Sequence, residues 1–227
     1  MFKGNFGKVV FIALLVILPM RGYSQGVRWM PGYLVNNNNE VIKGHIYLPF
    51  TTVTSGLVVA GIDLEWFYST VEFFDGETKV FEPDDIRSFG FTYSGLEYKF
   101  VSNLLLYKSI IKSDRSRQRF LQLEYKGAVT LFNDCVALQH DVPGVGGGRN
   151  IEAINYKEYY LYSEANGLQR LEIKKGKSLE VYLLESGVDE EFICDYPGRI
   201  KIRNIKAILI SYDEWLKEHG KEIAKST

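Results

Sequence analysis

The sequence predicts a mainly β protein that ends in α-helices, an α+β fold. Hairpin patterns fill residues 25–175, where short runs rich in β-branched and aromatic residues are separated by turn residues such as Asp-Gly and Lys-Gly. Helical spacing of apolar residues begins only after Gly176. We therefore expect an antiparallel β domain over 25–175, built as a meander of hairpins or as a partly open barrel. A C-terminal segment over 176–227 should pack on it with two or three helices.

Residues 1–24 have the layout of a secretory signal peptide. Two lysines give a positive start, Val9–Leu18 is an unbroken run of ten apolar residues, and Gly22 and Ser24 are small residues at the −3 and −1 positions of a cleavage site. Ten apolar residues are too few to cross a bilayer, which takes about 20. We expect a mature chain that begins at Gln25, has no transmembrane span and is exported to the periplasm, the outer-envelope surface or the medium. An uncleaved membrane anchor is the alternative.

The composition limits the classes of partner. Cleavage after Ser24 leaves 203 residues, enough for one sizeable core. It also moves the formal charge from −1 to −4, because three basic residues are lost. The densest basic cluster is Lys174–Lys177 at the edge of a turn, so the chain has no basic patch of the kind that binds nucleic acid. Nucleic acid is therefore not an expected partner.

Residues 69–92 predict three antiparallel strands in sequence order. Thr70–Phe74 is mostly β-branched and aromatic, and the Asp-Gly pair that follows it is typical of a tight hairpin turn. Thr78–Phe81 would return antiparallel, and Pro83 would end the pairing because it has no N–H to donate. Arg87–Thr92 would add the third strand of a meander.

Further strands follow from the same patterns. An Asn-rich turn at residues 36–39 separates the first two. Pro49–Leu64 is interpreted as a connecting loop with one edge strand, because its apolar run is too short for a helix. The remaining strands are expected at 31–36, 41–48, 96–101, 104–111, 119–125, 128–132, 159–163 and 168–173.

Two helices and a further helical turn are expected after Gly176. Ser178 is suited to the N-cap of the first and Gly187 to its C-terminal end, and one further helical turn fits residues 189–194. Asn204–Glu218 is the strongest helical pattern in the chain. Its apolar stripe should pack on the sheet or on the preceding helix, and consists of Ile205, Ile208, Leu209, Tyr212, Trp215 and Leu216.

The loop at residues 143–150, PGVGGGRN, is rich in glycine. A phosphate-binding loop is one interpretation, but the chain has neither the Gly-Lys-Ser/Thr of a P-loop nor a helical pattern after the loop. We therefore favour a surface loop.

Candidate catalytic residues do not form a recognisable set. The histidines His45, His140 and His219 have no second ligand at a spacing that would build a metal site, and no Ser or Cys lies in a Gly-x-Ser-x-Gly elbow. Asp84 and Asp85 could act as a carboxylate pair, although Pro-Asp-Asp is also ordinary turn chemistry. We expect no metal, no cofactor and no catalytic residue, and an enzyme is the less favoured hypothesis.

The chain has two cysteines, Cys135 and Cys194. In an exported protein they permit one disulfide, provided that their Cα atoms come within about 7 Å. Two free thiols are the alternative, and a catalytic pair of Cys135 with His140 is less favoured than either.

Aromatic residues are abundant, with 15 Tyr, 14 Phe and 3 Trp. Most should serve core and cross-strand packing, but exposed Tyr and Trp on a β surface can stack on sugars or peptides. Trp66 and Tyr68, which lie next to the Pro49–Leu64 segment, are the candidate ligand-binding pair.

The order of these segments resembles a family of uncharacterised exported β-rich proteins of Gram-negative bacteria. The similarity rests on a Ser-Gln junction after the leader, followed by GYLV, EVIKGHIYL, KVFEPDDIRSFGF, FLQLEYKGAVTLF and KEYYLY, and then by helices. It spans most of the mature chain. No activity is assigned to that family, so the resemblance implies export and a β-rich fold but no site residues.

Three functions stay open on the sequence alone. The first is a non-catalytic exported protein that binds an envelope partner, either a protein or a glycan. The second is a small hydrolase assembled from distant residues, with Asp84, Asp85 and His140 as candidates. The third is a carbohydrate-binding module that uses Trp66 and Tyr68. Clustered carboxylates or histidine in a deep pocket would favour the hydrolase, and an exposed aromatic row the sugar binder.

Overall fold

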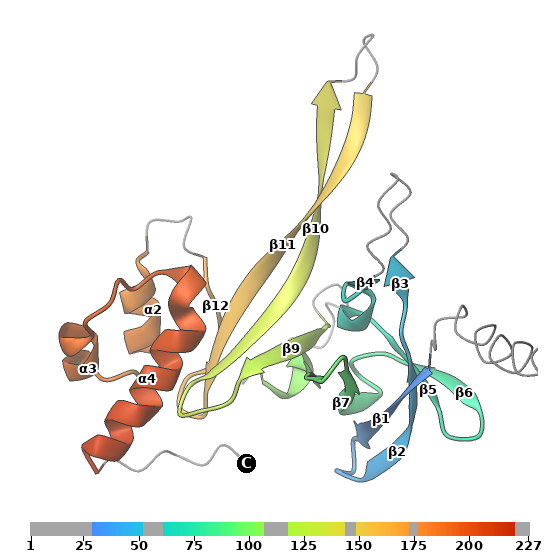
Figure 1. Cartoon of the computed structure of the whole chain (residues 1–227), viewed down its shortest axis with the longest axis horizontal. Helices are drawn as coiled ribbons and strands as arrows, with labels where there is room; N and C mark the ends of the chain where they lie inside the picture. Colours follow the sequence, from blue (N-terminus) through green and yellow to red (C-terminus); the bar gives the residue numbers. More distant parts are fainter. Residues whose placement is uncertain (1–28, 52–60, 107–117, 144–148, 173–176, 221–227) are drawn as a thin grey trace, which may run out of the picture.

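The structure is a computed structural model, and it describes residues 29–51, 61–106, 118–143, 149–172 and 177–220 (Figure 1). The expected signal peptide and the centre of the Gly-rich loop lie outside the described residues. The described part of the expected strand 104–111 is a 3-10 turn, η3 (Asn103–Leu105), and not a strand.

Within the described residues, ten strands form one open antiparallel sheet, and three α-helices follow it, so the α+β prediction is confirmed. The strand order is β12-β11-β10-β9-β8-β7-β1-β2-β5-β6, and the sheet does not close into a barrel. β3 (Phe50–Thr51) and β4 (Gly61–Ile62) pair separately. The ten strands are β1 (Trp29–Asn36), β2 (Val41–Tyr47), β5 (Val71–Phe74), β6 (Thr78–Phe81), β7 (Ile86–Tyr93), β8 (Leu96–Ser102), β9 (Phe120–Tyr125), β10 (Thr130–Pro143), β11 (Arg149–Ser163) and β12 (Gly167–Arg170).

The meander expected over residues 69–92 is correct for its first two strands and wrong for the third. β5 and β6 form the hairpin, and Gly76 in its turn has a φ of +124° that favours glycine. β7 does not pair with β6, but with β1 and β8 in the middle of the sheet. Burial explains the difference, because residues 88–91 of β7 are all buried, as in a central strand, whereas most of β6 is exposed and suits an edge.

A hydrogen-bonded crossing loop, residues 82–85, carries the chain from β6 at the edge of the sheet to β7 in its middle. Oδ2 of Asp85 accepts the backbone N–H of Glu82 at 2.8 Å. The side-chain amide of Asn37, in the β1–β2 turn, donates to the carbonyls of Asp84 and Asp85 at 3.0 and 3.1 Å. These contacts confirm the turn interpretation of Pro-Asp-Asp.

β10 and β11 are much longer than the sequence predicts. They pair without interruption from Thr130↔Tyr162 to Pro143↔Arg149. The pairs from Asp134↔Glu158 onward extend beyond the neighbouring strands as a two-stranded ribbon, about 30 Å long at roughly 3.3 Å per residue (Figure 1). The Gly-rich loop joins the two strands of this ribbon.

The strands β1, β2, β5, β7 and β8 enclose an aromatic core. A single 3-10 turn, η2 (Trp66–Tyr68), inserts Phe67 into it, with the ring 5.1, 5.5 and 5.7 Å from those of Phe91, Phe100 and Phe89. This core needs no covering helix, because its own strands and the turn fill it.

The three helices build a second core on the other end of the sheet (Figure 1). They are α2 (Leu179–Glu185), α3 (Glu190–Asp195) and α4 (Ile205–Glu218). Their apolar sides pack on Val129, Leu131 and Leu161. Ser178 occupies the N-cap of α2, and Gly187, with a φ of +93°, follows its end, as predicted.

Candidate functional site

The side chains of the predicted pair, Trp66 and Tyr68, are not exposed together on one surface. Both lie on η2, where Trp66 is 43% exposed but Tyr68 is only 1% exposed. The hydroxyl of Tyr68 donates to Oδ1 of Asn133 at 2.5 Å. Side chains two apart on a 3-10 turn point in different directions, so one ring faces solvent and the other enters the core.

Tyr68 belongs instead to a buried polar network at the foot of the ribbon. The side-chain amide of Asn133 donates to Glu124, and Arg119 forms an ion pair with Asp134, with Nε 2.7 Å from Oδ2. Burial raises the pKa of the Asp134 carboxyl to about 6, although the hydrogen bond and charge of Arg119 act to lower it. Only 3% of the Asp134 side chain is exposed, so this carboxyl ties strands together and is not presented to a ligand.

The hydrolase candidates do not come together. Asp84 and Asp85 lie in the crossing loop described above, and Asp85 uses its carboxylate within that loop. His140 lies on the β10 ribbon opposite Glu152, beyond the strands that flank the ribbon. Among the residues that the structure describes, no three His, Cys, Asp or Glu side chains cluster in a way that could hold a metal ion.

The disulfide hypothesis is not supported, because Cys135 and Cys194 are both free thiols. Cys135 is half-buried on β10 and packs against the aromatic core, whereas Cys194 is exposed on α3 at the helical end. The two residues thus belong to different parts of the molecule.

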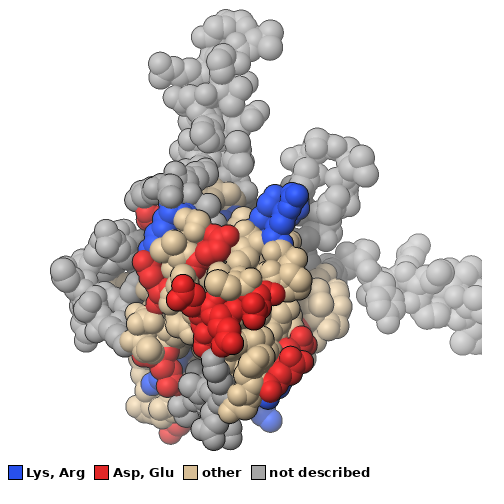
Figure 2. All heavy atoms as spheres, turned by 90° about the vertical axis from the view of Figure 1, so that its left-hand side faces the viewer, with Lys and Arg blue, Asp and Glu red and all other residues tan. Residues whose placement is uncertain are grey.

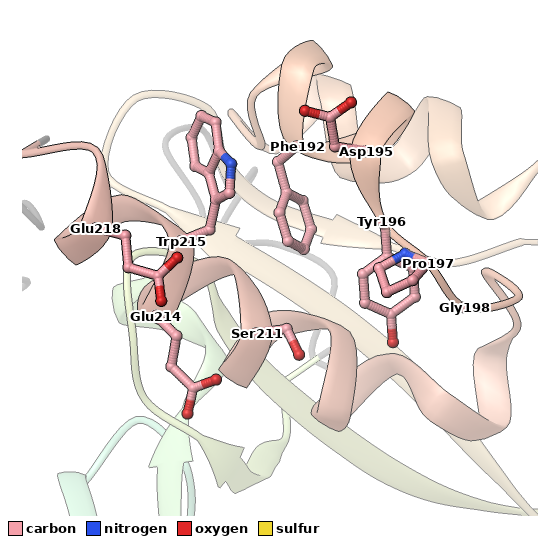
Figure 3. A pocket seen from close by; sticks show the side chains of 9 residues that line it. All are labelled: Phe192, Asp195, Tyr196, Pro197, Gly198, Ser211, Glu214, Trp215 and Glu218. Carbon is pink, nitrogen blue, oxygen red and sulfur yellow. The ribbon is translucent and has the colours of Figure 1, made fainter.

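The candidate site is a groove of about 450 Å³ between α3 and α4 (Figure 3). Three aromatic rings form its apolar side, and the Phe192 ring centre lies 5.5 Å from that of Tyr196 and 6.0 Å from that of Trp215. The remaining lining residues are Asp195, Pro197, Gly198, Ser211, Glu214 and Glu218.

Local sequence explains each of the two walls of the groove. Tyr196 adopts an extended conformation because Pro197 follows it, and α3 therefore ends at Asp195. On α4, residues three and four apart share one face, which places Ser211, Glu214, Trp215 and Glu218 along the same wall. The helical period of these four residues could have indicated the groove, but nothing in the sequence places α3 opposite that wall.

The groove is strongly acidic. Three carboxylates line it, and the described lining residues include no Lys or Arg. Residues 179–194 add five further acidic residues and no basic one. Figure 2 shows Asp and Glu gathered on this face of the molecule, where the exposed acidic residues of α3 and α4 are Glu190, Glu191, Asp195, Glu214 and Glu218.

No family model, curated protein or solved structure matches this chain. No helix among the described residues is long and apolar enough to cross a membrane. The chemistry of the groove is therefore the basis on which a function can be proposed.

Proposed function

We propose that this protein is an exported, non-catalytic binding protein whose α3–α4 groove docks a basic segment of a cell-envelope protein. The observation that carries the proposal is the combination of three aromatic rings and three carboxylates around one groove. The signal-peptide pattern of residues 1–24 supports export.

A Lys or Arg side chain fits both parts of this groove. Its methylene stem can lie along apolar surface while its charged end reaches carboxylates. The faces of aromatic rings attract cations, and Trp does so most strongly. Trp215 and Phe192 would therefore contact the stem or the cation, while Glu214 and Glu218 on the rim would bind the charge.

A basic polypeptide is favoured over a single cation because the acidic surface is wider than the groove. Glu190 and Glu191 lie at the start of α3 and are not among the described lining residues. A segment with several positive charges can engage these outer carboxylates and the groove together. Its association should then be steered by charge and weakened by salt.

Fluorescence anisotropy tests this proposal with the exported chain and a labelled peptide of alternating Gly, Lys and Arg. We expect saturable binding that weakens as salt is raised, and no binding of the matched peptide that carries Glu in place of Lys and Arg. Trp215→Ala should weaken binding roughly tenfold, and Glu214→Lys with Glu218→Lys severalfold. The control variants are Trp66→Ala and Glu164→Lys, which change exposed residues elsewhere and should bind like the parent.

Two results would reject the groove as the docking site. One is the absence of salt-dependent binding by the basic peptide. The other is equal loss of affinity in Trp215→Ala and Trp66→Ala. Export is tested separately by N-terminal sequencing of the protein from periplasm or medium, where we expect Gln25 as the first residue and where retention of Met1 in membranes would contradict it.

A further inference from the structure

A second pocket lies at the opposite end of the sheet, and its volume is about 400 Å³. Its described lining residues are Trp29, His45, Phe74 and Thr78. They come from the four adjacent strands β1, β2, β5 and β6, at the β6 edge of the sheet. The volume falls in the range of small-ligand pockets, roughly 300–1,000 Å³.

Strand register shows that these side chains share one face of the sheet. His45 is opposite Phe74, and Phe74 is opposite Thr78. Trp29 is opposite Tyr47, which lies two residues from His45 and so points the same way. The four lining residues thus form a row across four strands.

The other face of the same strands is the buried one. Ile46 and Phe73, which are opposite each other and alternate with the pocket residues, are buried in the aromatic core. The pocket row therefore lies on the outer face, and Phe74 is 40% exposed there. Phe74, which is opposite both His45 and Thr78, therefore does not serve to fill the core.

The chemistry of the row is aromatic, polar and uncharged. The ring centres of Trp29 and Phe74 are 6.0 Å apart and their planes are tilted by 60°, so the two rings present surfaces at an angle to each other. The imidazole of His45 and the hydroxyl of Thr78 can each donate or accept a hydrogen bond. No Asp, Glu, Lys or Arg is among the described lining residues.

From this combination we infer that the Trp29–His45–Phe74–Thr78 pocket binds a neutral saccharide. The C–H groups of a sugar ring can lie on the faces of Trp29 and Phe74, which carry the negative part of the ring quadrupole. Its hydroxyl groups can bond to His45 and Thr78 at the polar part of the pocket. The site is separate from the α3–α4 groove, since the described lining residues of the two have none in common.

The three tryptophans of the chain allow the two sites to be read separately. Trp29 lies in this pocket, Trp215 lies in the groove, and Trp66 lines neither of them. A variant with Trp66→Phe and Trp215→Phe leaves Trp29 as its only tryptophan. Its fluorescence reports the pocket, and the basic peptide of the previous section should leave it unchanged.

The probes are two neutral trisaccharides, one built of N-acetylglucosamine and one of glucose. We expect at least one to change the Trp29 fluorescence and to bind with a Kd of about 1 mM or tighter by calorimetry. Phe74→Ala should weaken binding roughly tenfold. Val80→Ala is the matched control, because Val80 is an exposed apolar residue on β6 that does not line the pocket. Its affinity should equal that of the parent.

Phe74 is partly exposed, so Phe74→Ala should fold, and a thermal melt of the variant checks this. Thr78→Ala gives a second test at an exposed position and should weaken binding severalfold through the loss of a hydrogen bond. The inference is overturned if neither trisaccharide binds, or if both variants bind like Val80→Ala. Neither result would affect the peptide-binding test of the groove.

Discussion

The hydroxyl of Tyr125 on β9 donates a 2.6 Å hydrogen bond to Oδ2 of Asp213 on α4. Oδ1 of the same carboxylate accepts the backbone N–H of Ala128 at 3.1 Å. Gly127 lets the carboxylate approach, because a Cβ at that position would lie 2.0 Å from Oδ2. Asp213 thus attaches α4 to the β9–β10 turn, while Glu214 and Trp215, the next two residues, face the groove.

Asp213→Ala should lower the free energy of unfolding by about 2–3 kcal/mol. The carboxylate is buried, and its removal leaves the Tyr125 hydroxyl and the Ala128 N–H without their acceptor. The neighbouring change Glu214→Ala, at an exposed position, should cost well under about 1 kcal/mol. Urea unfolding of both variants provides the measurement. Equal stability would show that the Asp213 contacts do not hold α4 on the sheet.

The α4 packing gives a second prediction. Ile208 is fully buried against the sheet side of the helical core. Ile208→Asp would place a charge without a partner in this core and should cost several kcal/mol, a large part of the roughly 5–15 kcal/mol of a typical domain. Lys206→Asp on the exposed face should change stability by less than about 1 kcal/mol. Thermal melts distinguish the two, and parent-like melting of both would mean that α4 is a loose appendage.

Local pattern was sufficient to predict α4 and the hairpins, because their signals lie within a few residues of each other. The apolar spacing from Ile205 to Leu216 predicts a helix, and five of the six residues of its stripe are buried, whereas Trp215 is only partly buried. Asp213, expected on the outer face of the helix, is buried instead. Asp75-Gly76 predicts the β5–β6 turn. The pairing of β7 with β1 was not predictable in this way. It depends on Asn37 and on β1, which lie about 50 residues away in the sequence.

Both proposed sites depend on such distant contacts. Trp29 and Phe74 meet only because β2 lies between β1 and β5. Trp215 meets Phe192 only because α3 and α4 pack on the same part of the sheet. The abundance of aromatic residues indicated a binding surface. Of the pair chosen for its proximity in the sequence, however, Trp66 is exposed to solvent and Tyr68 is buried in the core.

The crossing loop gives a third prediction, with a conservative variant as its control. Asp85→Ala removes the acceptor of the Glu82 N–H and should cost about 1 kcal/mol. Asp85→Asn keeps a side-chain oxygen at the same place and should cost less than half as much. Chemical denaturation compares the two. If Asn is as damaging as Ala, the carboxylate charge, and not the hydrogen bond, supports the loop.

The last prediction concerns how the free energy of unfolding depends on pH. The contribution of Asp134 should change with pH in the opposite direction to that of a typical ion-paired carboxylate. An ion pair normally lowers a carboxyl pKa, so that stability is lost as pH falls. Here burial outweighs Arg119 and raises the pKa of Asp134 to about 6, above its ordinary value of 3.8. Between these two values the folded chain holds the Asp134 proton while the unfolded chain has released it.

The contribution of Asp134 to stability is therefore fully present below about pH 4 and is lost as pH rises through about 6. Asp134→Asn removes this titration and leaves all other carboxyl groups in place. From pH 4 to pH 7, the free energy of unfolding of the parent, relative to that of the variant, should fall by about 2–3 kcal/mol. Urea unfolding at several pH values measures this difference, and Glu164→Gln on the exposed β11–β12 turn should keep the slope of the parent. A difference that rises with pH would mean that Arg119, and not burial, controls Asp134.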